Sequence, residues 1–335
     1  MRAAVFVKPG SVLVQEVETP RPGPGEVLVN VAACGICGSD VHGYRTGVLV
    51  PGCVIGHEYS GWVEDVGAGA DGLERGDLVA GNSTFGCGEC EACRRGQDNL
   101  CKDVRILGVS VDGAMARSVA VPASSLVKVE GGDPEELALS EPLSVALRAW
   151  RAVELEKGDP LVVTGAGPIG LLVLLLARYY GCENVVVSEP RPERAALAEA
   201  LGATRVIDPR SERLLSAVPE GAGAVVECSG AAVALMEAPA LVRARGRIIP
   251  VAIYDQPIAT DYLTLMAKEI GIQPVFLTTR KEFGDAVDLI SRHAVDVRPV
   301  ISTAVELDAV PTTLEELADG GGATGNAAKV LVRPI

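Results

Sequence analysis

The chain has 335 residues with 48% apolar side chains, and its 44 acidic groups outnumber 30 basic ones, giving a formal net charge of −14. This length predicts two domains, each large enough to bury its own core. A chain this acidic repels nucleic acid and anionic membranes, so we expect neither as a partner. The first residues lack the apolar core of a signal peptide, and a cytoplasmic protein is expected.

The N-terminal part consists of short β-branched runs that are separated by Pro and Gly. This pattern predicts an irregular β domain made of short strands. The expected strands cover residues 3–7, 12–17, 27–33, 60–66, 77–80 and 115–122.

Two short segments of this part carry metal-binding side chains. Cys37-Gly38-Ser39-Asp40-Val41-His42 is followed by Gly56-His57-Glu58, and two of the chain's three histidines lie here. A thiolate, an imidazole and a carboxylate bind zinc with three protein ligands and leave the fourth position for water or substrate. Taken singly, Cys37 is better explained as a buried core thiol and His57 as a hydrogen-bonded core histidine. Together, just ahead of the cysteine cluster that follows, they predict a catalytic zinc site.

A cluster of four cysteines comes next, with the spacing C-x2-C-x2-C-x7-C: Cys87, Cys90, Cys93 and Cys101. Four thiolates in a closed shell suit Zn²⁺ and leave no position for substrate, so the predicted site is structural. Iron–sulfur clusters also use four cysteines, but the familiar ferredoxin spacings differ. Disulfides are disfavoured because nothing else indicates secretion and such close neighbours would have to pair outside their own cluster.

The pattern changes near residues 141–142, after which residues 143–153 are expected to be helical. A predicted strand over 161–164 then leads into a glycine-rich turn and a helix over 171–180. Between a strand and a helix, G-x-G-x-x-G predicts a turn whose backbone amides approach a pyrophosphate. The candidate cofactor residues of this turn are Gly165, Gly167, Pro168, Ile169 and Gly170. The turn also interrupts the uncharged stretch of residues 160–177, which is therefore predicted not to span a membrane.

The next predicted strand, residues 184–188, ends in Glu189, which stands 19 residues after Gly170. An acidic group at this place accepts both ribose hydroxyls of NAD and repels the 2′-phosphate of NADP. We therefore expect NAD as the cofactor. Arg191 and Arg194 follow closely, and a swing of either side chain toward the ribose is the route by which NADP could be used instead.

Helices and strands alternate through the remainder of this region. A helix is expected over 192–201, with strands over 205–207, 224–228, 247–251 and 270–276. Together with the two strands before them these make six, the number in a full dinucleotide-binding sheet. Residues 320–323 are expected to form a surface loop, and residues 329–332 a final strand.

The order of these motifs resembles that of the zinc-dependent medium-chain dehydrogenases, a family that includes alcohol, sorbitol, threonine and butanediol dehydrogenases. The resemblance extends from Met1 to Ile335. It implies an α/β fold with β: a GroES-like catalytic domain in residues 1–145 and 277–335, and a Rossmann dinucleotide-binding domain with a doubly wound parallel sheet in residues 146–276. It also implies an active site in the cleft between the domains, and a homodimer or homotetramer.

The resemblance assigns roles to the candidate metal ligands. Cys37 and His57 are the implied first ligands of the catalytic zinc, and either Glu58 or Glu141 completes the set, directly or through water. The four clustered cysteines hold the structural zinc. Asp40 is expected to accept the other ring N–H of His57 and so to fix its tautomer.

The resemblance also assigns the proton path and one cofactor contact. Ser39 and His42 match the family's relay, in which a hydroxyl takes the proton of the substrate and a histidine passes it to solvent. Lys329 is expected to contact the pyrophosphate, because a basic residue opens the family's last strand.

The implied activity is hydride transfer between NAD and a secondary alcohol, diol or polyol, which yields a ketone. It requires one catalytic and one structural Zn²⁺ per chain; the metal acts as a Lewis acid and the cofactor carries the hydride. The alternatives are a non-catalytic nucleotide-binding relative and an NADP-preferring dehydrogenase. A zinc-free reductase such as a quinone reductase is disfavoured because those proteins lack both metal motifs.

The substrate is the least defined part of this prediction. The metal-site segments look most similar to the sorbitol and butanediol dehydrogenase branch. Polyol-acting relatives often carry an Arg at the place where this chain has Leu277. Tyr44, Phe85 and Leu277 would make a pocket wall suited to a smaller or less hydroxylated secondary alcohol.

Overall fold

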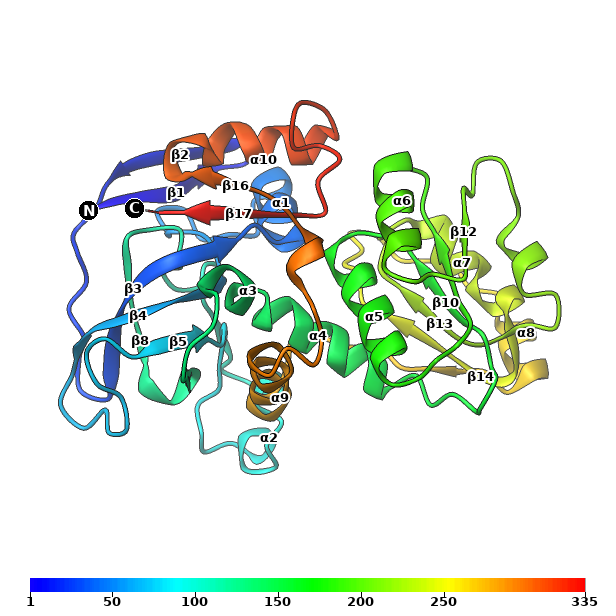
Figure 1. Ribbon diagram of the computed structural model, residues 1–335, viewed down its shortest axis with the longest axis horizontal. Helices are drawn as coiled ribbons and strands as arrows, with labels where there is room; N and C mark the ends of the chain where they lie inside the picture. Colours follow the sequence, from blue (N-terminus) through cyan, green and yellow to red (C-terminus); the bar gives the residue numbers. More distant parts are fainter. Residues whose placement is uncertain (335) are drawn as a thin grey trace. The chain divides into compact units, whose positions relative to one another are not determined.

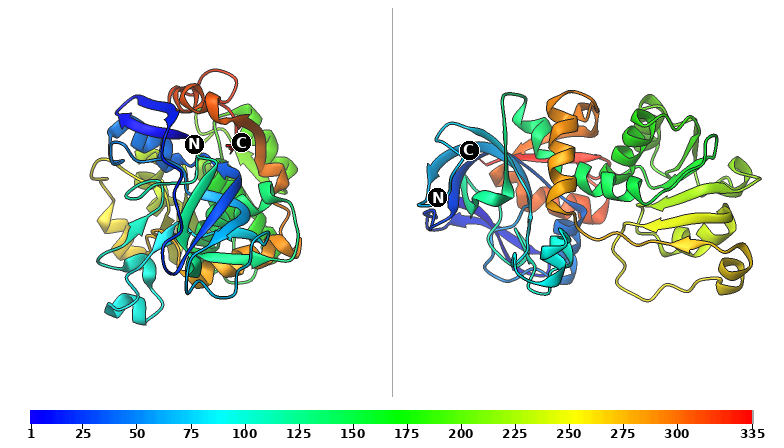
Figure 2. Two further views of the ribbon diagram at one scale, coloured as in Figure 1. Left: turned by 90° about the vertical axis from the view of Figure 1, so that its left-hand side faces the viewer. Right: turned by 90° about the horizontal axis from the view of Figure 1, so that it is seen from below.

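The computed structural model describes residues 1–334 and separates into two compact units. Unit 1 comprises Met1–Ser144 and the segment from Leu277 onward, and unit 2 comprises Val145–Phe276. The N-terminus and the end of the described chain lie side by side in unit 1 (Figures 1 and 2). The segment after Phe276 therefore completes unit 1 rather than extending unit 2.

Unit 1 is built on a seven-stranded sheet with the order β16-β17-β3-β4-β5-β9, and β8 also pairs with β3. Its strands pair antiparallel except for β16 and β17, which are parallel. The bounds are β3 (Glu26–Gly35), β4 (Glu58–Val66), β5 (Leu78–Gly81), β8 (Ser118–Pro122), β9 (Leu126–Val129), β16 (Ile301–Glu306) and β17 (Lys329–Arg333). Two antiparallel pairs lie outside this sheet: β1 (Arg2–Lys8) with β2 (Ser11–Glu16), and β6 (Thr84–Phe85) with β7 (Arg105–Ile106).

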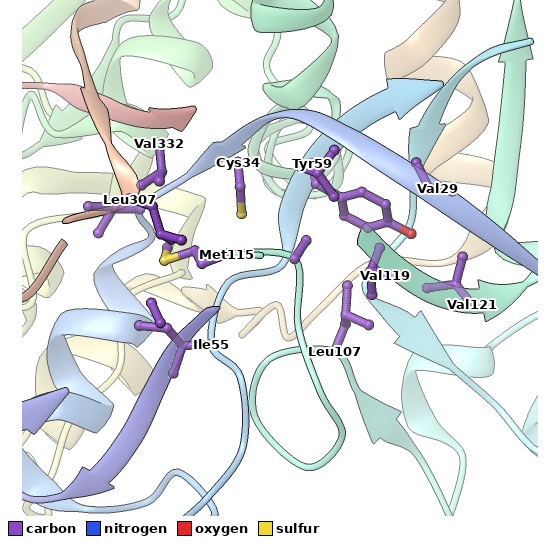
Figure 3. Close-up of a cluster of buried hydrophobic side chains, with 14 of the residues drawn as sticks. Val29, Cys34, Ile55, Tyr59, Leu107, Met115, Val119, Val121, Leu307 and Val332 are labelled. Carbon is purple, nitrogen blue, oxygen red and sulfur yellow. The ribbon is translucent and has the colours of Figure 1, made fainter. Parts of the chain in front are cut away.

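The core of unit 1 lies against one face of this sheet (Figure 3). Because side chains alternate along a strand, every second residue of β3 from Val27 to Val31 is fully buried. Tyr59 of β4 occupies the space above Gly81, where an added Cβ would meet the tyrosine ring at 1.9 Å. Leu307 and Val332 join the same cluster, so the C-terminal segment is an integral part of this core.

The helices of unit 1 are short: α1 (Gly38–Thr46), α2 (Glu91–Arg94), α3 (Pro134–Ala138), α9 (Arg280–Ser291) and α10 (Val310–Asp319). At the start of α1 the Asp40 carboxylate accepts the backbone N–H of Cys37 at 2.9 Å, which satisfies a donor that has no partner within the helix. The helix ends at Gly47, whose φ of +81° suits a left-handed C-terminal residue. The sequence analysis did not predict this helix, although its residues carry the motif that begins at Cys37.

Unit 2 contains a six-stranded sheet, all parallel, with the order β12-β11-β10-β13-β14-β15. The strands are β10 (Leu161–Thr164), β11 (Val185–Ser188), β12 (Arg205–Ile207), β13 (Ala222–Glu227), β14 (Val242–Pro250) and β15 (Gly271–Ile272). The helices are α5 (Pro168–Tyr179), α6 (Pro192–Ala200), α7 (Ala232–Leu241) and α8 (Tyr262–Lys268), and α4 (Ser140–Arg151) begins in unit 1 and ends in unit 2. The strand order reverses between β10 and β13, and ligands bind at the carboxyl ends of strands at such a switch point.

This sheet confirms the predicted fold class of six parallel strands with alternating helices. The last strand is shorter than expected because Pro274 cannot donate to a ladder. The backbone N–H groups of Gln273 and Val275 still donate to carbonyls of β14, at 2.9 and 3.2 Å. The uncharged stretch of residues 160–177 is divided between β10, the turn and α5, and no helix within residues 1–334 has the length and apolar character to cross a bilayer.

Candidate functional site

Cys37, His57 and Glu58 converge in unit 1, each offering one ligand atom, and these three atoms lie within 4.8 Å of one another. Cys37 precedes α1, and Glu58 begins β4, where it pairs with Gly35 of β3. A Cβ on Gly35 would meet the Glu58 carboxylate at 2.0 Å. The absence of a side chain at Gly35 therefore gives this carboxylate its place.

His57 is buried and lies between two polar side chains. The Oγ of Ser39 is 3.2 Å from His57 Nε2, and the Oδ1 of Asp40 is 3.5 Å from His57 Nδ1. Burial lowers the pKa of His57, but the charges of Asp40 and Cys37 raise it more, and the pKa lies well above its ordinary value. Asp40 faces Nδ1 of His57, as the sequence analysis expected, but the two atoms do not form a hydrogen bond.

Lys329 makes a contact that the sequence analysis did not expect. Its side chain is 1% exposed, and its ammonium donates to both oxygens of Glu58, at 2.7 and 2.5 Å, and to the carbonyl of Ile36 at 2.9 Å. Burial lowers the pKa of Lys329, but Glu58 and Cys37 raise it more, so the pKa stays above its usual value. All three N–H donors of the ammonium are engaged inside unit 1. In the described chain Lys329 therefore forms an ion pair beside the candidate metal site, and its expected pyrophosphate contact stays a prediction.

Glu141, the other expected carboxylate ligand, lies near this cluster but outside the closest set. Ser83 Oγ donates to Glu141 Oε1 at 2.9 Å. Burial raises the pKa of Glu141, while the charge of His57 lowers it. Of the two candidate carboxylates, Glu58 lies within the three-ligand set and Glu141 is held by a hydroxyl.

The two expected proton-relay residues lie on α1, Ser39 in its first turn and His42 three residues later. Residues three apart on a helix are neighbours on its surface, and both side chains are half-buried. Ser39 contacts the ring of His57, so one end of the expected path lies beside the candidate zinc ligands.

These residues fit a zinc ion with an open coordination position. A thiol, an imidazole and a carboxylate form the donor set of catalytic zinc sites. His57 Nδ1 and Asp40 Oδ1 are buried without a hydrogen bond in the described part of the chain, although they face each other. Asp40 thus lies beside the ring nitrogen that it is expected to support, and the metal would be held by Cys37, His57 and Glu58.

The four clustered cysteines also converge, with all sulfur atoms within 4.8 Å of one another. Backbone N–H groups point at these sulfurs: Cys87 N donates to Cys101 Sγ at 3.2 Å, and Cys90 N to Cys87 Sγ at 3.4 Å. The backbone amide of Cys93 helps to lower the pKa of Cys90, because it donates to the Cys90 sulfur. No cysteine in residues 1–334 forms a disulfide, and this geometry fits a closed four-thiolate zinc site.

The glycine-rich turn of unit 2 borders a cavity of about 460 Å³. Gly165 has a φ of +90°, and an added Cβ would lie 2.8 Å from Ser229 Cα, so only glycine fits. Gly170 is equally restricted, since its Cβ would meet the carbonyl oxygen of Gly165 at 1.9 Å. Gly167 precedes α5, with Pro168 and Ile169 in the first turn, so the free N–H groups of the helix begin at this turn.

Glu189 lies at the end of β11 and lines the same cavity. Its carboxylate accepts the N–H of Ala166 at 2.8 Å and the N–H of Arg191 at 2.9 Å. Arg194 lines the cavity beside Gly167, and burial together with the charge of Arg191 lowers its pKa. The structure therefore brings together the turn, Glu189 and Arg194, as the sequence analysis expected.

Sequence reasoning missed one buried carboxylate at this edge of the sheet. Glu227 ends β13, is fully buried, and accepts hydrogen bonds from Thr164 and Ser229, which line the cavity. Its signal is visible in the sequence, because a lone acidic residue ends the apolar run of residues 222–226. A charge at the end of a buried strand requires partners, and it therefore marks a functional or organising position.

Comparison with known proteins agrees with this geometry. Residues 23–131 match the family model of the alcohol dehydrogenase GroES-like domain, and residues 168–292 match that of the zinc-binding dehydrogenases. An L-threonine 3-dehydrogenase of Pyrococcus horikoshii is 37% identical over 278 residues, which cover 79% of this chain and 80% of that protein.

Two solved structures are similar over 99% of both chains, each with a TM-score of 0.92. One is a putative zinc-binding dehydrogenase from Sinorhizobium meliloti 1021 bound to NADP, with 29% sequence identity. The other is an alcohol dehydrogenase from Escherichia coli CFT073 complexed with NADH, with 28% identity.

Proposed function

Because the chain belongs to the zinc-type medium-chain dehydrogenase/reductase family, we propose that it transfers a hydride between a secondary alcohol, diol or polyol and NAD, forming a ketone. The observation that carries this proposal is the convergence of Cys37, His57 and Glu58 in unit 1. A zinc ion held by these residues would polarise the substrate oxygen as a Lewis acid, and the nicotinamide would accept the hydride. A second zinc in the four-cysteine lobe would be structural.

The chain's own residues prepare this chemistry. Asp40 orients the ring of His57 from its Nδ1 side, and Lys329 fixes the Glu58 carboxylate, which also packs against Gly35. Ser39 Oγ lies 3.2 Å from His57 Nε2, the ring nitrogen that Asp40 does not face, and we propose that it accepts the proton of the substrate. His42 on the same helix would pass that proton to solvent, a role that histidine commonly has in proton relays.

The preference for NAD over NADP rests on Glu189. Its carboxylate lies at the carboxyl end of β11 on the cavity wall, where it meets the adenosine ribose of a bound dinucleotide. A 2′-phosphate would lie against this negative charge. The solved relatives include one bound to NADP and one complexed with NADH, so both cofactors occur on this fold. We expect Glu189→Ser to narrow the ratio of kcat/KM for NAD⁺ over NADP⁺ by at least about tenfold, the size of one lost charge contact.

The relative from Pyrococcus horikoshii is named for oxidation at position 3 of L-threonine, which is a secondary alcohol. Leu277 offers no hydrogen bond to extra hydroxyls, which favours a substrate with few of them. We therefore expect 2,3-butanediol to be oxidised faster than sorbitol, and a strong preference for sorbitol would contradict this view of the substrate.

We also propose that the chain forms a homodimer or homotetramer. Several apolar side chains of unit 2 are unusually exposed: Leu263 by 69% and Met266 by 60% on α8, and Ile272 by 44% on the edge strand β15. Such a patch beside an unpaired strand edge is a liability in a monomer. Light scattering should give a mass of two or four chains, and Leu263→Asp should reduce it.

The activity is tested by following reduced nicotinamide with NAD⁺ or NADP⁺ and a panel of secondary alcohols, diols, polyols and L-threonine. Turnover that needs zinc supports the proposal, and the best substrate identifies the branch. A protein that binds NADH and zinc yet oxidises none of the panel would support the non-catalytic alternative. The presence of the complete ligand set speaks against that alternative.

A further inference from the structure

Glu227 connects three loops at the carboxyl edge of the unit 2 sheet. It stands between Thr164 of β10 and Pro250 of β14 in the strand register. Its Oε1 accepts hydrogen bonds from the backbone N–H of Ser229 at 2.8 Å and of Gly230 at 3.1 Å, and from the hydroxyls of Thr164 and Ser229. One oxygen atom therefore holds the end of β10 and the loop after β13 together.

The loop after β13 in turn supports the glycine-rich turn. Ser229 packs against Gly165 so closely that an added Cβ on the glycine would lie 2.8 Å from Ser229 Cα. From the other side, Glu189 accepts the N–H of Ala166 in the same turn. The turn is thus held between two carboxylates, and any shift of Ser229 is transmitted to the backbone that approaches a pyrophosphate.

The second oxygen of Glu227 has a different partner. Within residues 1–334, Oε2 accepts one hydrogen bond, which comes from the hydroxyl of Tyr254. Tyr254 lies in the segment between β14 and α8, where Ile253 is 54% exposed and residues 255–257 are also exposed. Tyr254 itself is half-buried, so it anchors an otherwise solvent-facing loop to the carboxylate.

We propose that Tyr254 and Glu227 form a positioning pair for the dinucleotide cofactor: the tyrosine hydroxyl fixes the plane of the Glu227 carboxylate, which fixes Ser229 and through it the glycine-rich turn. The pair itself is one step removed from the cofactor, since Thr164 and Ser229, rather than Tyr254 and Glu227, line the cavity. This inference rests on the proposed function, because it assumes that the cavity binds NAD.

The physical reason for a functional effect is the freedom of the carboxylate. Without the tyrosine hydroxyl, Oε2 is a buried acceptor with no donor, and the carboxylate gains by rotating toward water or toward the remaining donors. Rotation weakens the bonds from Oε1 to Ser229 and Gly230 and lets the loop after β13 move. The binding-competent arrangement of the turn is then a smaller fraction of the ensemble, which reduces the apparent affinity for the nucleotide in proportion.

The test is the affinity of the purified full chain for NADH, measured by fluorescence titration, in wild type, Tyr254→Phe, Glu227→Gln and the double variant. Tyr254→Phe keeps the ring and removes only the hydroxyl. We expect it to weaken NADH binding about tenfold, the loss appropriate to a hydrogen bond on a charged group. Glu227→Gln should weaken it more, because an amide N–H₂ would face donors.

Steady-state kinetics give a second readout, the change in KM for NAD⁺ compared with the change in kcat. A tyrosine that only stabilised the fold would not change KM selectively. In Tyr254→Phe, KM for NAD⁺ should rise by a similar factor while kcat stays within about twofold, since ground-state positioning alone is lost. The double variant should be no weaker than Glu227→Gln, because both changes remove the same coupling. The matched control is Tyr179→Phe at the end of α5, where the residue is 45% exposed; removal of its hydroxyl should change neither quantity.

The outcomes separate this inference from the proposed function. If wild type binds neither NADH nor NADPH, the proposed function fails. If wild type binds NADH and Tyr254→Phe binds it equally well, the positioning pair is overturned, whatever the melting temperature does. Additive losses in the double variant would also overturn it. Should Glu227→Gln not fold, the comparison of Tyr254→Phe with Tyr179→Phe still decides.

Discussion

The two candidate metal sites of unit 1 are built in opposite ways. The four-cysteine lobe takes every ligand from residues 87–101, and local backbone amides support its sulfur atoms. The site of Cys37, His57 and Glu58 joins separate segments, and its Glu58 is fixed by Gly35 and by Lys329 from the last strand. A closed site can be assembled by one loop, whereas an open site must be held by the fold, since no fourth protein ligand completes it.

The largest effects are expected when one cysteine ligand is removed from each metal site, because one site should support turnover and the other stability. Cys37→Ser should leave one zinc per chain and reduce turnover by at least about 10³-fold, because the Lewis acid contributes several kcal/mol to the barrier. Cys93→Ser should lose the other zinc and several kcal/mol of local stability, with initial turnover nearly unchanged. Metal analysis, turnover and limited proteolysis on the same samples check both. If Cys93→Ser lost turnover without unfolding, the claim that the four-cysteine site is purely structural would be contradicted.

Lys329→Met should show how strongly the fold supports the open site. It leaves the Glu58 carboxylate buried and unpaired, and zinc-depleted protein should lose about 3–5 kcal/mol of unfolding free energy. Urea unfolding measures this. The control is Arg333→Met on the same strand, whose pair with Glu135 is partly exposed and should contribute at most about 1 kcal/mol. Equal losses in the two variants would mean that the buried pair has no special role.

Asp40→Asn should give a smaller effect confined to the open site. A group that orients a metal-binding histidine typically changes metal affinity by about 10–100-fold when it is removed. Competition with a chelating indicator would measure the zinc affinity of the Cys37–His57–Glu58 site, whose zinc is the one that Cys37→Ser removes. Asp65→Asn, a change to an exposed carboxylate on β4, should have no effect. If Asp40→Asn also leaves the affinity unchanged, the 3.5 Å approach of Asp40 to His57 has no orienting role.

The same contrast explains what could be predicted from sequence. The four-cysteine site could be predicted almost completely from the spacing of its cysteines, because all four ligands are close along the chain. For the open site, residue types indicated Cys37, His57 and Glu58, but nothing local shows that Lys329, 271 residues after Glu58, is its partner. The resemblance to the family assigned this basic side chain to the pyrophosphate. That pairing depends on β17 lying beside β3, a long-range contact with no signature in short motifs.

Unit 2 was more predictable for a related reason. Buried parallel strands are continuous apolar runs, and the glycine-rich turn stands between a strand and a helix, so the number of strands and the place of the turn could be predicted from local patterns. Tyr254 and its bond to Glu227 were not predicted, since a tyrosine in a polar loop has no distinguishing pattern. Helix α1 was missed because functional residues obscure its apolar periodicity.

The most direct test of the whole account is the rate of NADH formation from NAD⁺ and 2,3-butanediol before chelation, after zinc is removed and after it is added back. We predict that turnover is lost with the zinc of the Cys37–His57–Glu58 site and returns when zinc is restored. An unchanged rate in the metal-free protein would contradict the assignment of that site as the centre that activates the substrate.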